Sequence, residues 1–270
     1  MFKMKIKFKL LTMAILSTVI LTACGNTPTT DNSLTDIKAK KELVVGLDDN
    51  FPPMGFRDKS GQIVGFDIDI AKEVGKRMGV KVTFKPVEWD GIILSLNNKD
   101  IDLIWNGLTI TDKRKEQIAF SNVYVQNKQI IIVNSKSTIS KKSTLTDKTV
   151  GLQLGSSSET ALAKDTTLSK SVKEIKKYSN NTEALLDLKA GRIDAVVVDE
   201  VVGRYYVSKK PGMYKVLNEN LGVEDYGVGI RKNDTALTTE INKQLEAIKK
   251  DGTSNTISKK WFGKDIIYKK

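Results

Sequence analysis

One short run of the chain, Trp-Asn-Gly-Leu-Thr-Ile-Thr-Asp-Lys-Arg at residues 105–114, has the residue types needed to bind a carboxylate. An apolar strand ends here in a small-residue turn, in which Gly107 lets a ligand approach the backbone and Thr109 offers a hydroxyl donor. Arg114 follows with a planar guanidinium that matches two carboxylate oxygens. Taken alone, the run is equally consistent with a solvated arginine, because most arginines lie at the surface.

A second run with related chemistry, Gly-Ser-Ser-Ser-Glu at residues 155–159, follows a predicted strand at 150–154. Ser156 and Glu159 have the spacing of a capping box, so a helix should begin here. The free amides at such a helix start suit an anion. Local residues alone leave two interpretations of equal weight, an anion site and a simple helix cap.

An acid, Asp199, ends the apolar run at residues 193–198, which predicts a buried strand. In open α/β sheets, ligands bind beyond the carboxyl ends of the strands, so Asp199 is well placed to accept from an ammonium group. The alternative interpretation is a helix cap for the segment that starts near Glu200.

The chain has no histidine and a single cysteine. Without histidine, Ser-His-Asp and Cys-His catalysis and the common histidine metal sites are excluded. Carboxylates, lysines and serines could still perform acid–base work, so an enzyme is disfavoured rather than excluded. We therefore expect no catalytic residue, no metal and no cofactor.

The amino terminus has the layout of an export signal, with four lysines followed by an apolar stretch at residues 10–21. A helix of that stretch is too short to span a bilayer, which takes about 20 residues. The following Leu-Thr-Ala-Cys resembles the lipobox of bacterial lipoproteins, which predicts a signal peptide at 1–23 and lipid attachment at Cys24. The alternative is an ordinary secretory signal with an incidental cysteine.

The segment after the signal peptide, residues 24–41, is largely polar and predicts a flexible tether. Removal of residues 1–23 lowers the formal net charge from +12 to +8, because it takes away four lysines and no acids. The remaining lysines are scattered rather than gathered with aromatics, so we expect no nucleic-acid partner. Such a basic surface suits a protein held by a lipid anchor on the extracytoplasmic face of the cell membrane.

The elements that must position these residues are short apolar strands that alternate with amphipathic helices, which predicts an α/β fold with largely parallel sheets. Residues 66–78 predict a helix with one apolar face, Asp67 and Asp69 in its first turn, and Gly79 after its last. Asp90 is predicted to cap a further helix. Strands are predicted at 43–47, 80–84 and 101–105, and a late helix has Leu237, Ile241, Leu245 and Ile248 on one face.

The plan repeats in a second half, and the chain should pass between the halves twice. The predicted boundaries are 42–130 with 227–270 for the first lobe, 131–226 for the second lobe, and hinge crossings near 129–134 and 222–228. Two crossings imply a hinge between the lobes.

Taken together, several segments resemble the polar amino-acid family of bacterial solute-binding proteins, the receptors that feed ATP-driven importers. The resemblance covers roughly residues 42–263 and rests on residues 48–56, 65–69, 88–93, 107–114, 151–159, 193–199, 252–253 and 261–263. It implies a two-lobed periplasmic-binding-protein-like fold of class II, with a ligand held in the cleft. It also implies a monomer that delivers an amino acid to an ABC permease in the membrane.

The resemblance implies a role for each site residue. The α-carboxylate would be held by Arg114, Thr109 and a backbone amide near Ser157, and the α-ammonium by Gly107 and Asp199. The side chain would be held by Phe51 and Trp89 as an aromatic pair, by Asp48 at its far end, and by the neutral groups of Asn106 and Gln153. Both charges of a desolvated zwitterion need partners, because an unpaired buried ion costs several kcal/mol.

Asp48 favours a ligand with donors at its end, such as arginine, lysine, histidine or glutamine, and cystine is an alternative ligand. One rival function is a periplasmic dehydratase acting on prephenate or arogenate, for which Glu88 and Asp48 are the candidate general acids. Another is a surface adhesin, which would bind host matrix without needing Arg114.

Overall fold

The computed structural model describes residues 31–269. The predicted signal peptide, the proposed lipid site Cys24 and most of the predicted tether lie outside the described residues. Within the described part of the chain, no helix combines the length and the apolar character needed to cross a membrane.

The first of two five-stranded sheets has the strand order β5-β1-β6-β13-β7. Its strands are β1 (Glu42–Leu47), β5 (Lys81–Pro86), β6 (Leu103–Ile104), β7 (Ala119–Phe120) and β13 (Gly229–Ile230). β1 pairs in parallel with β5 and β6, whereas β13 pairs antiparallel with β6 and β7. A late strand therefore returns from the second half of the chain into the first sheet.

Helices cover both faces of the first sheet, because its central strands are apolar on both sides. α2 (Phe66–Met78) and α9 (Thr235–Lys250) bury their apolar faces against Leu43 and Val45, while α3 (Ile92–Asn97) contributes to a separate cluster on Ile101 and Ile104. α10 (Thr253–Phe262) packs on α2 and α9. A small sheet of β2 (Asn50–Phe51), β3 (Gly55–Arg57) and β4 (Ile63–Val64) follows β1.

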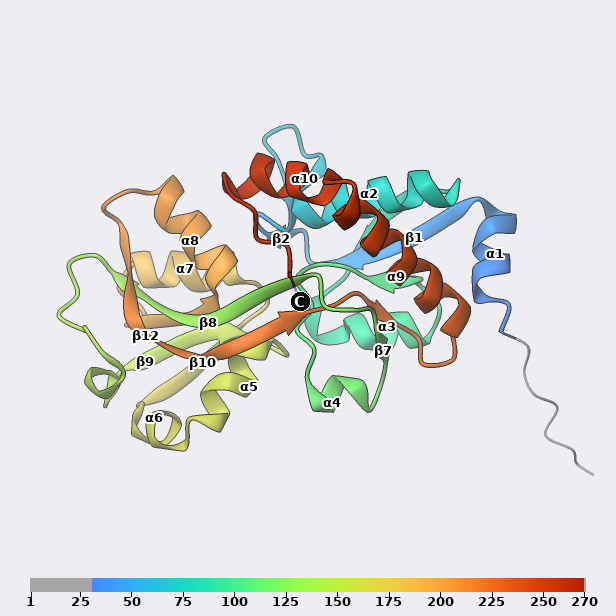
Figure 1. Ribbon diagram of the computed structural model, residues 1–270. Helices are drawn as coiled ribbons and strands as arrows, with labels where there is room; N and C mark the ends of the chain where they lie inside the picture. The colour runs from blue at the N-terminus through green and yellow to red at the C-terminus, as the bar shows by residue number, and fades with distance from the viewer. Residues whose placement is uncertain (1–30, 270) are drawn as a thin grey trace, which may run out of the picture. The chain divides into compact units, whose positions relative to one another are not determined.

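The second sheet has the order β10-β9-β11-β8-β12. Its strands are β8 (Val125–Asn134), β9 (Thr149–Gln153), β10 (Glu174–Tyr178), β11 (Ala195–Asp199) and β12 (Tyr214–Tyr226). Figure 1 shows α7 (Asn181–Lys189) and α8 (Glu200–Lys209) on one face, and α5 (Ser157–Lys164) and α6 (Thr166–Ser171) on the other. Alternate residues of one strand serve both layers: Ile130 and Ile132 pack with α7 and α8, whereas Ile131 packs with α5 and α6.

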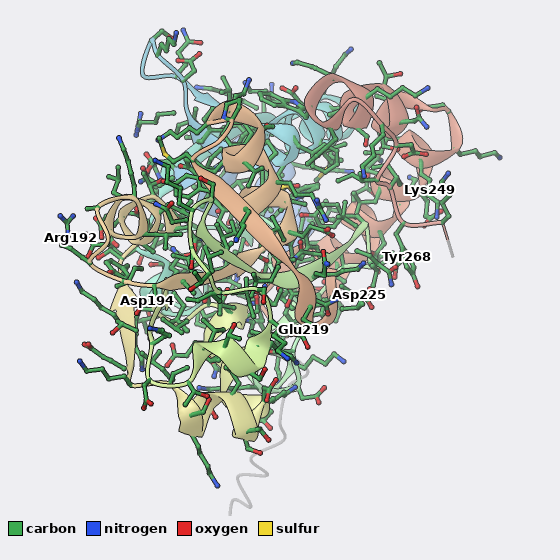
Figure 2. The ribbon with its side chains drawn as sticks, turned by 90° about the vertical axis from the view of Figure 1, so that its left-hand side faces the viewer. Arg192, Asp194, Glu219, Asp225, Lys249 and Tyr268 are labelled. Carbon is green, nitrogen blue, oxygen red and sulfur yellow. The ribbon has the colours of Figure 1, made fainter. Side chains whose placement is uncertain are left out.

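The two longest strands, β8 and β12, run side by side in antiparallel pairing, from Tyr226 opposite Val125 to Tyr214 opposite Asn134 (Figure 1). Glu219 and Asp225, labelled in Figure 2, both lie on β12. All of β8 belongs to the second sheet, because Gln129 and Ile130 already pair with β11. The second sheet thus starts before the predicted lobe boundary at residue 130, and the hinge positions stay predictions.

Two local predictions were wrong. Part of the predicted tether forms helix α1 (Ser33–Lys40), because Ile37 is buried in the core and Asp31 accepts hydrogen bonds from Thr235 and Ala236. Asp90 does not cap α3: it lies within a 3-10 turn, and the helix starts after Gly91 without a side-chain cap.

Candidate functional site

The turn after β6 is shaped around Gly107, which has φ of 60°, a left-handed backbone conformation that favours glycine. A Cβ atom there would lie 3.0 Å from the Phe51 ring and 3.1 Å from the Tyr226 ring. The Gly107 amide donates to Asp67 Oδ2 at 2.7 Å, and Tyr124 donates to the same oxygen at 3.0 Å. The buried acid Asp67 of α2 therefore fixes the conformation of this turn.

Arg114 lies in the short helix α4 (Asp112–Lys115), whose start is capped by the Thr111 hydroxyl. Its side chain is buried, and its guanidinium donates to the Thr109 carbonyl at 2.9 Å and across to the Gly155 carbonyl at 3.2 Å. Burial lowers the pKa of this guanidinium, and the negative charges of Glu224 and Asp199 oppose that shift. No acid of the described residues lies within 4.0 Å of it.

Across from Arg114, helix α5 begins as predicted, with the Ser156 hydroxyl accepting from the Glu159 amide. The reciprocal bond is displaced by one residue, since the Glu159 carboxylate accepts from Gly155 at 3.0 Å. Thr109 Oγ1 donates to Ser157 Oγ at 3.0 Å, so hydroxyls of the two halves meet here. Gly155 has φ of 71°, and a Cβ there would lie 3.1 Å from the Asp90 Cα.

The predicted aromatic pair is present: the rings of Phe51 and Trp89 are stacked, with centroids 6.4 Å apart and planes within 2°. The Arg114 guanidinium lies 5.7 Å from the Trp89 ring. The aromatic pair and the cation therefore border the same region of the molecule.

Asp48 follows β1 and is buried with the two neutral polar residues predicted to accompany it. Its backbone amide donates to Asn106 Oδ1 at 3.1 Å, and Gln153 Nε2 of the second half donates to its carboxylate at 2.7 Å. Burial raises the pKa of Asp48 above its usual value, against the hydrogen bonds of Asn50 and Gln153. The Asn106 Nδ2 amide is buried and has no acceptor among the described residues.

Asp199 ends β11 and occupies the N-cap position of α8, but its side chain makes no capping hydrogen bond. Its Oδ1 atom accepts from Tyr226, from Asn127 at 2.7 Å and from Gln129 at 3.0 Å. Burial, followed by the charge of Glu224, raises the pKa of Asp199 well above its usual range.

Four members of this network were missed by the sequence analysis: Asn127, Gln129, Glu224 and Tyr226. They occupy alternate positions of β8 and β12, so each pair lies on one face of the sheet. An alternation of polar and apolar residues along these strands could have indicated which side chains share a face. Both faces of these stretches carry polar residues, so the alternation does not single out these four.

Two cavities adjoin these residues. One, of about 310 Å³, is lined by Thr109, Gln129, Ser157 and Glu224 among others. The other, of about 610 Å³, includes Asp90, Arg114 and Gly155 in its wall. Of the ten predicted ligand-binding residues, only Thr109, Ser157 and Arg114 line these two cavities. The other seven border neither: Asp48, Phe51, Trp89, Asn106, Gly107, Gln153 and Asp199.

The structure therefore brings the ten predicted ligand-binding residues to one seam between the two sheets. Glu88, a candidate general acid, is exposed. Residues 31–269 contain no group of three or more histidine, cysteine or acidic side chains arranged to hold a metal ion.

These features define a class of protein, a two-lobed α/β protein with opposed charges at the facing ends of two sheets. Residues 43–264 match the bacterial extracellular solute-binding proteins, family 3, and the chain belongs to that family.

The similarity to known family members extends over most of their length. The chain is 37% identical over 226 residues to the lysine/arginine/ornithine-binding periplasmic protein of Escherichia coli (strain K12), covering 81% of this chain and 86% of that protein. It is 32% identical over 235 residues to the L-cystine-binding protein TcyJ of the same strain, covering 86% and 87%. A crystal structure of an ABC uptake transporter substrate binding protein from Streptococcus pneumoniae with bound histidine has a TM-score of 0.86, 39% identity and coverage of 89% and 99%.

Proposed function

We propose that this protein captures one polar L-amino acid, with a basic side chain preferred, between its two lobes and delivers it to an ABC permease. The observation that carries this proposal is Arg114, a buried guanidinium without an acid partner among the described residues. Leaving a buried charge unpaired costs several kcal/mol, so this site is built to receive an anion. The Thr109 and Ser157 hydroxyls and the start of α5 lie beside it, which suits an α-carboxylate.

The charge balance of the cleft supports a basic ligand. The predicted site buries one cation, Arg114, and two acids, Asp48 and Asp199. A zwitterion supplies one charge of each sign and leaves the acids in excess, whereas a basic amino acid adds one further positive charge. Asp48 would take that charge at the far end of the aromatic pair, where a flat cation can also contact the ring faces. The relative named for lysine, arginine and ornithine and the solved structure with bound histidine support this preference.

Ligand binding should favour a closed arrangement of the lobes. Arg114 belongs to the half built on the first sheet and Asp199 to the half built on the second, so each half satisfies one charge of the ligand. A ligand that contacts both halves shifts the population toward the state in which both contacts form.

The partners follow from the family and from the amino terminus. We infer that the protein is a monomer, that Cys24 carries a lipid on the extracytoplasmic face of the cell membrane, and that a permease accepts the closed form. Labelling cells with a radioactive fatty acid should mark the protein, and a Cys24→Ala variant should remain unlabelled.

The decisive experiment is calorimetric titration with the twenty amino acids, ornithine and cystine. We expect the tightest binding for arginine, lysine, ornithine or histidine, weaker binding for glutamine, and the weakest for acidic amino acids. The proposal fails if none of these compounds binds. Tightest binding of cystine would keep the receptor function and replace its ligand.

A dehydratase is the second candidate, because the buried Asp48 with its raised pKa could act as an acid. The other candidate acid, Glu88, is exposed, and the relatives named above are binding proteins, which makes binding the better-supported role. Incubation with prephenate or arogenate should yield no product, and turnover of either compound would make the protein an enzyme.

A further inference from the structure

The carboxyl group of Glu224, on β12, has no role in the amino-acid site as proposed, although it lies directly beside Asp199. Asn127 Nδ2 donates to Asp199 Oδ1 and to Glu224 Oε1, at 2.7 Å in each case. Gln129 Nε2 also donates to both oxygens, at 3.0 and 2.7 Å. Because the two oxygens share both amide nitrogens, the two acids form one unit, here called the carboxyl pair.

The groups around the carboxyl pair leave its negative charge largely uncompensated. Tyr226 donates to Asp199, and the Ser157 hydroxyl lies 3.3 Å from Glu224 Oε1, but both are neutral donors. Arg114 feels the charge of both acids but forms an ion pair with neither.

Further charged groups face Glu224 across the cavity of about 310 Å³. They are Lys115 and Asp112 of α4, Lys164 of α5, and Asp225 of β12. Asp225, labelled in Figure 2, accepts from Gln126 at 3.1 Å. None of the lysines lies within ion-pair distance of Asp199 or Glu224.

The second oxygen of each acid has no hydrogen-bond partner among the described residues, and of the two acids only Glu224 lines the cavity of about 310 Å³. Asp199 Oδ2 and Glu224 Oε2 accept no hydrogen bond from the described residues, in contrast to their partner oxygens with three donors each. Burial, followed by the charge of the adjacent Glu224, raises the pKa of Asp199 well above its usual range, which favours one proton held at the carboxyl pair. An ammonium group brought to these oxygens would supply the positive charge that the proton otherwise supplies.

We propose that Glu224 is a further ligand-binding residue, which together with Asp199 forms a two-carboxyl site for the amine of the ligand, and that amine binding releases the shared proton to solvent. The inference rests on the proposed function and deepens it. The ammonium arrives already protonated, so one proton leaves the carboxyl pair and no other group changes its covalent bonds.

The carboxyl pair would therefore select for an amine. A ligand with a hydroxyl in place of the α-amine cannot displace the proton, because it brings no positive charge. Binding of the amine should weaken as the pH falls, since the proton then competes with it, by at most about tenfold per pH unit for one proton.

The test is titration of the protein with L-arginine at pH 5.5, 6.5 and 7.5, each in two buffers of different ionisation enthalpy. The wild-type protein should release a substantial fraction of one proton at pH 5.5 to 6.5 and lose affinity as the pH falls. Glu224→Gln should bind more weakly at pH 7.5, by about three- to tenfold, and lose most of the pH dependence, because Asp199 then ionises without a charged neighbour.

Two variants serve as controls. Glu219→Gln makes the same change at an exposed position of the same strand, labelled in Figure 2, and should behave as wild type. Asp48→Asn removes the other buried acid of the cleft and should keep the pH dependence that comes from the carboxyl pair.

An unchanged pH dependence in Glu224→Gln would overturn the inference. So would the absence of proton release from the wild-type protein, a measurement that does not depend on the variant folding. A wild-type protein that binds no amino acid at any pH would instead overturn the proposed function itself, so the two failures are distinguishable.

Discussion

The two halves of the molecule treat buried charge in opposite ways. On the first half, Arg114 makes hydrogen bonds to carbonyl groups only, and no acid of the described residues pairs with it. On the second half, Asp199 and Glu224 lie within a dense set of neutral donors. We propose that a dipolar ligand between the halves neutralises the cation of one half and the acids of the other. The difference indicates that the site is assembled from two incomplete parts.

A second contrast separates a structural acid from the acids of the cleft. Asp67 is fully buried like Asp199, but its two donors, Gly107 and Tyr124, belong to the first half alone. Burial raises the pKa of Asp67 to about 7, against those hydrogen bonds. Asp67 therefore fixes the shape of the Gly107 turn, whereas Asp199 faces the seam between the halves.

The largest expected effect comes from removing the cation of the first half. Arg114→Ala should weaken amino-acid binding by at least about 100-fold, because the ligand carboxylate would then be buried without a partner. Calorimetry measures the change. Arg204→Ala, which removes an exposed arginine paired with Glu200, is the matched control and should bind normally. Normal binding by Arg114→Ala would show that the two halves do not divide the charges as proposed.

A smaller and selective effect is expected at Asp48. Asp48→Asn should weaken binding of arginine or lysine by about tenfold and that of glutamine by less than about twofold, since only the first two bring a charge to this position. Competition titrations with the three ligands measure the ratio. An equal loss for all three would mean that Asp48 supports the pocket without contacting the ligand charge.

Substitution of Asp67, the structural acid, should change the pH dependence of protein stability rather than ligand selectivity. Between pH 4 and 7 the unfolded chain ionises Asp67 while the folded protein keeps its proton, so the unfolded state binds fewer protons. Wild-type stability should therefore fall with rising pH relative to Asp67→Asn, by up to about 1.4 kcal/mol per pH unit. Urea unfolding of both proteins at pH 4.5, 6 and 7.5 measures this difference, and parallel curves would contradict it.

The smallest effect is expected at an aromatic contact between the halves, outside the polar site. Phe56 of β3 and Tyr205 of α8 have ring centroids 5.8 Å apart. Tyr205→Ala should weaken every ligand by the same factor of about three, because it removes a contact of the closed state and touches no ligand. A change in the ranking of ligands would place Tyr205 in the specificity site instead.

The regular elements could be predicted from the sequence because burial imposes a period on them. The helix at 66–78 has the predicted bounds, with Gly79 in the left-handed conformation after its last turn. The late helix buries all four residues of its predicted face. The strand predicted at 101–105 shortens to β6, since only two of its residues pair regularly with neighbouring strands.

The polar network could not be predicted in the same way. Asn127 and Glu224 meet only because β8 and β12 pair over a long stretch, and that pairing joins residues far apart in the chain. Asp67 has the appearance of an ordinary acid in the first turn of a helix, and nothing nearby in the sequence reveals its bond to Gly107. Local periodicity reports which face is apolar, but it does not report which polar side chains meet across a fold.

The absence of a side chain at Gly155 determines how closely the two halves of the receptor can approach each other. A single methyl group there would press on the backbone of Asp90, which belongs to the opposite half. Even an alanine at this position would hold the two halves slightly apart. Because the Gly155 carbonyl accepts from Arg114, it would also disturb the guanidinium proposed to bind the ligand, and both effects should shorten the lifetime of the complex.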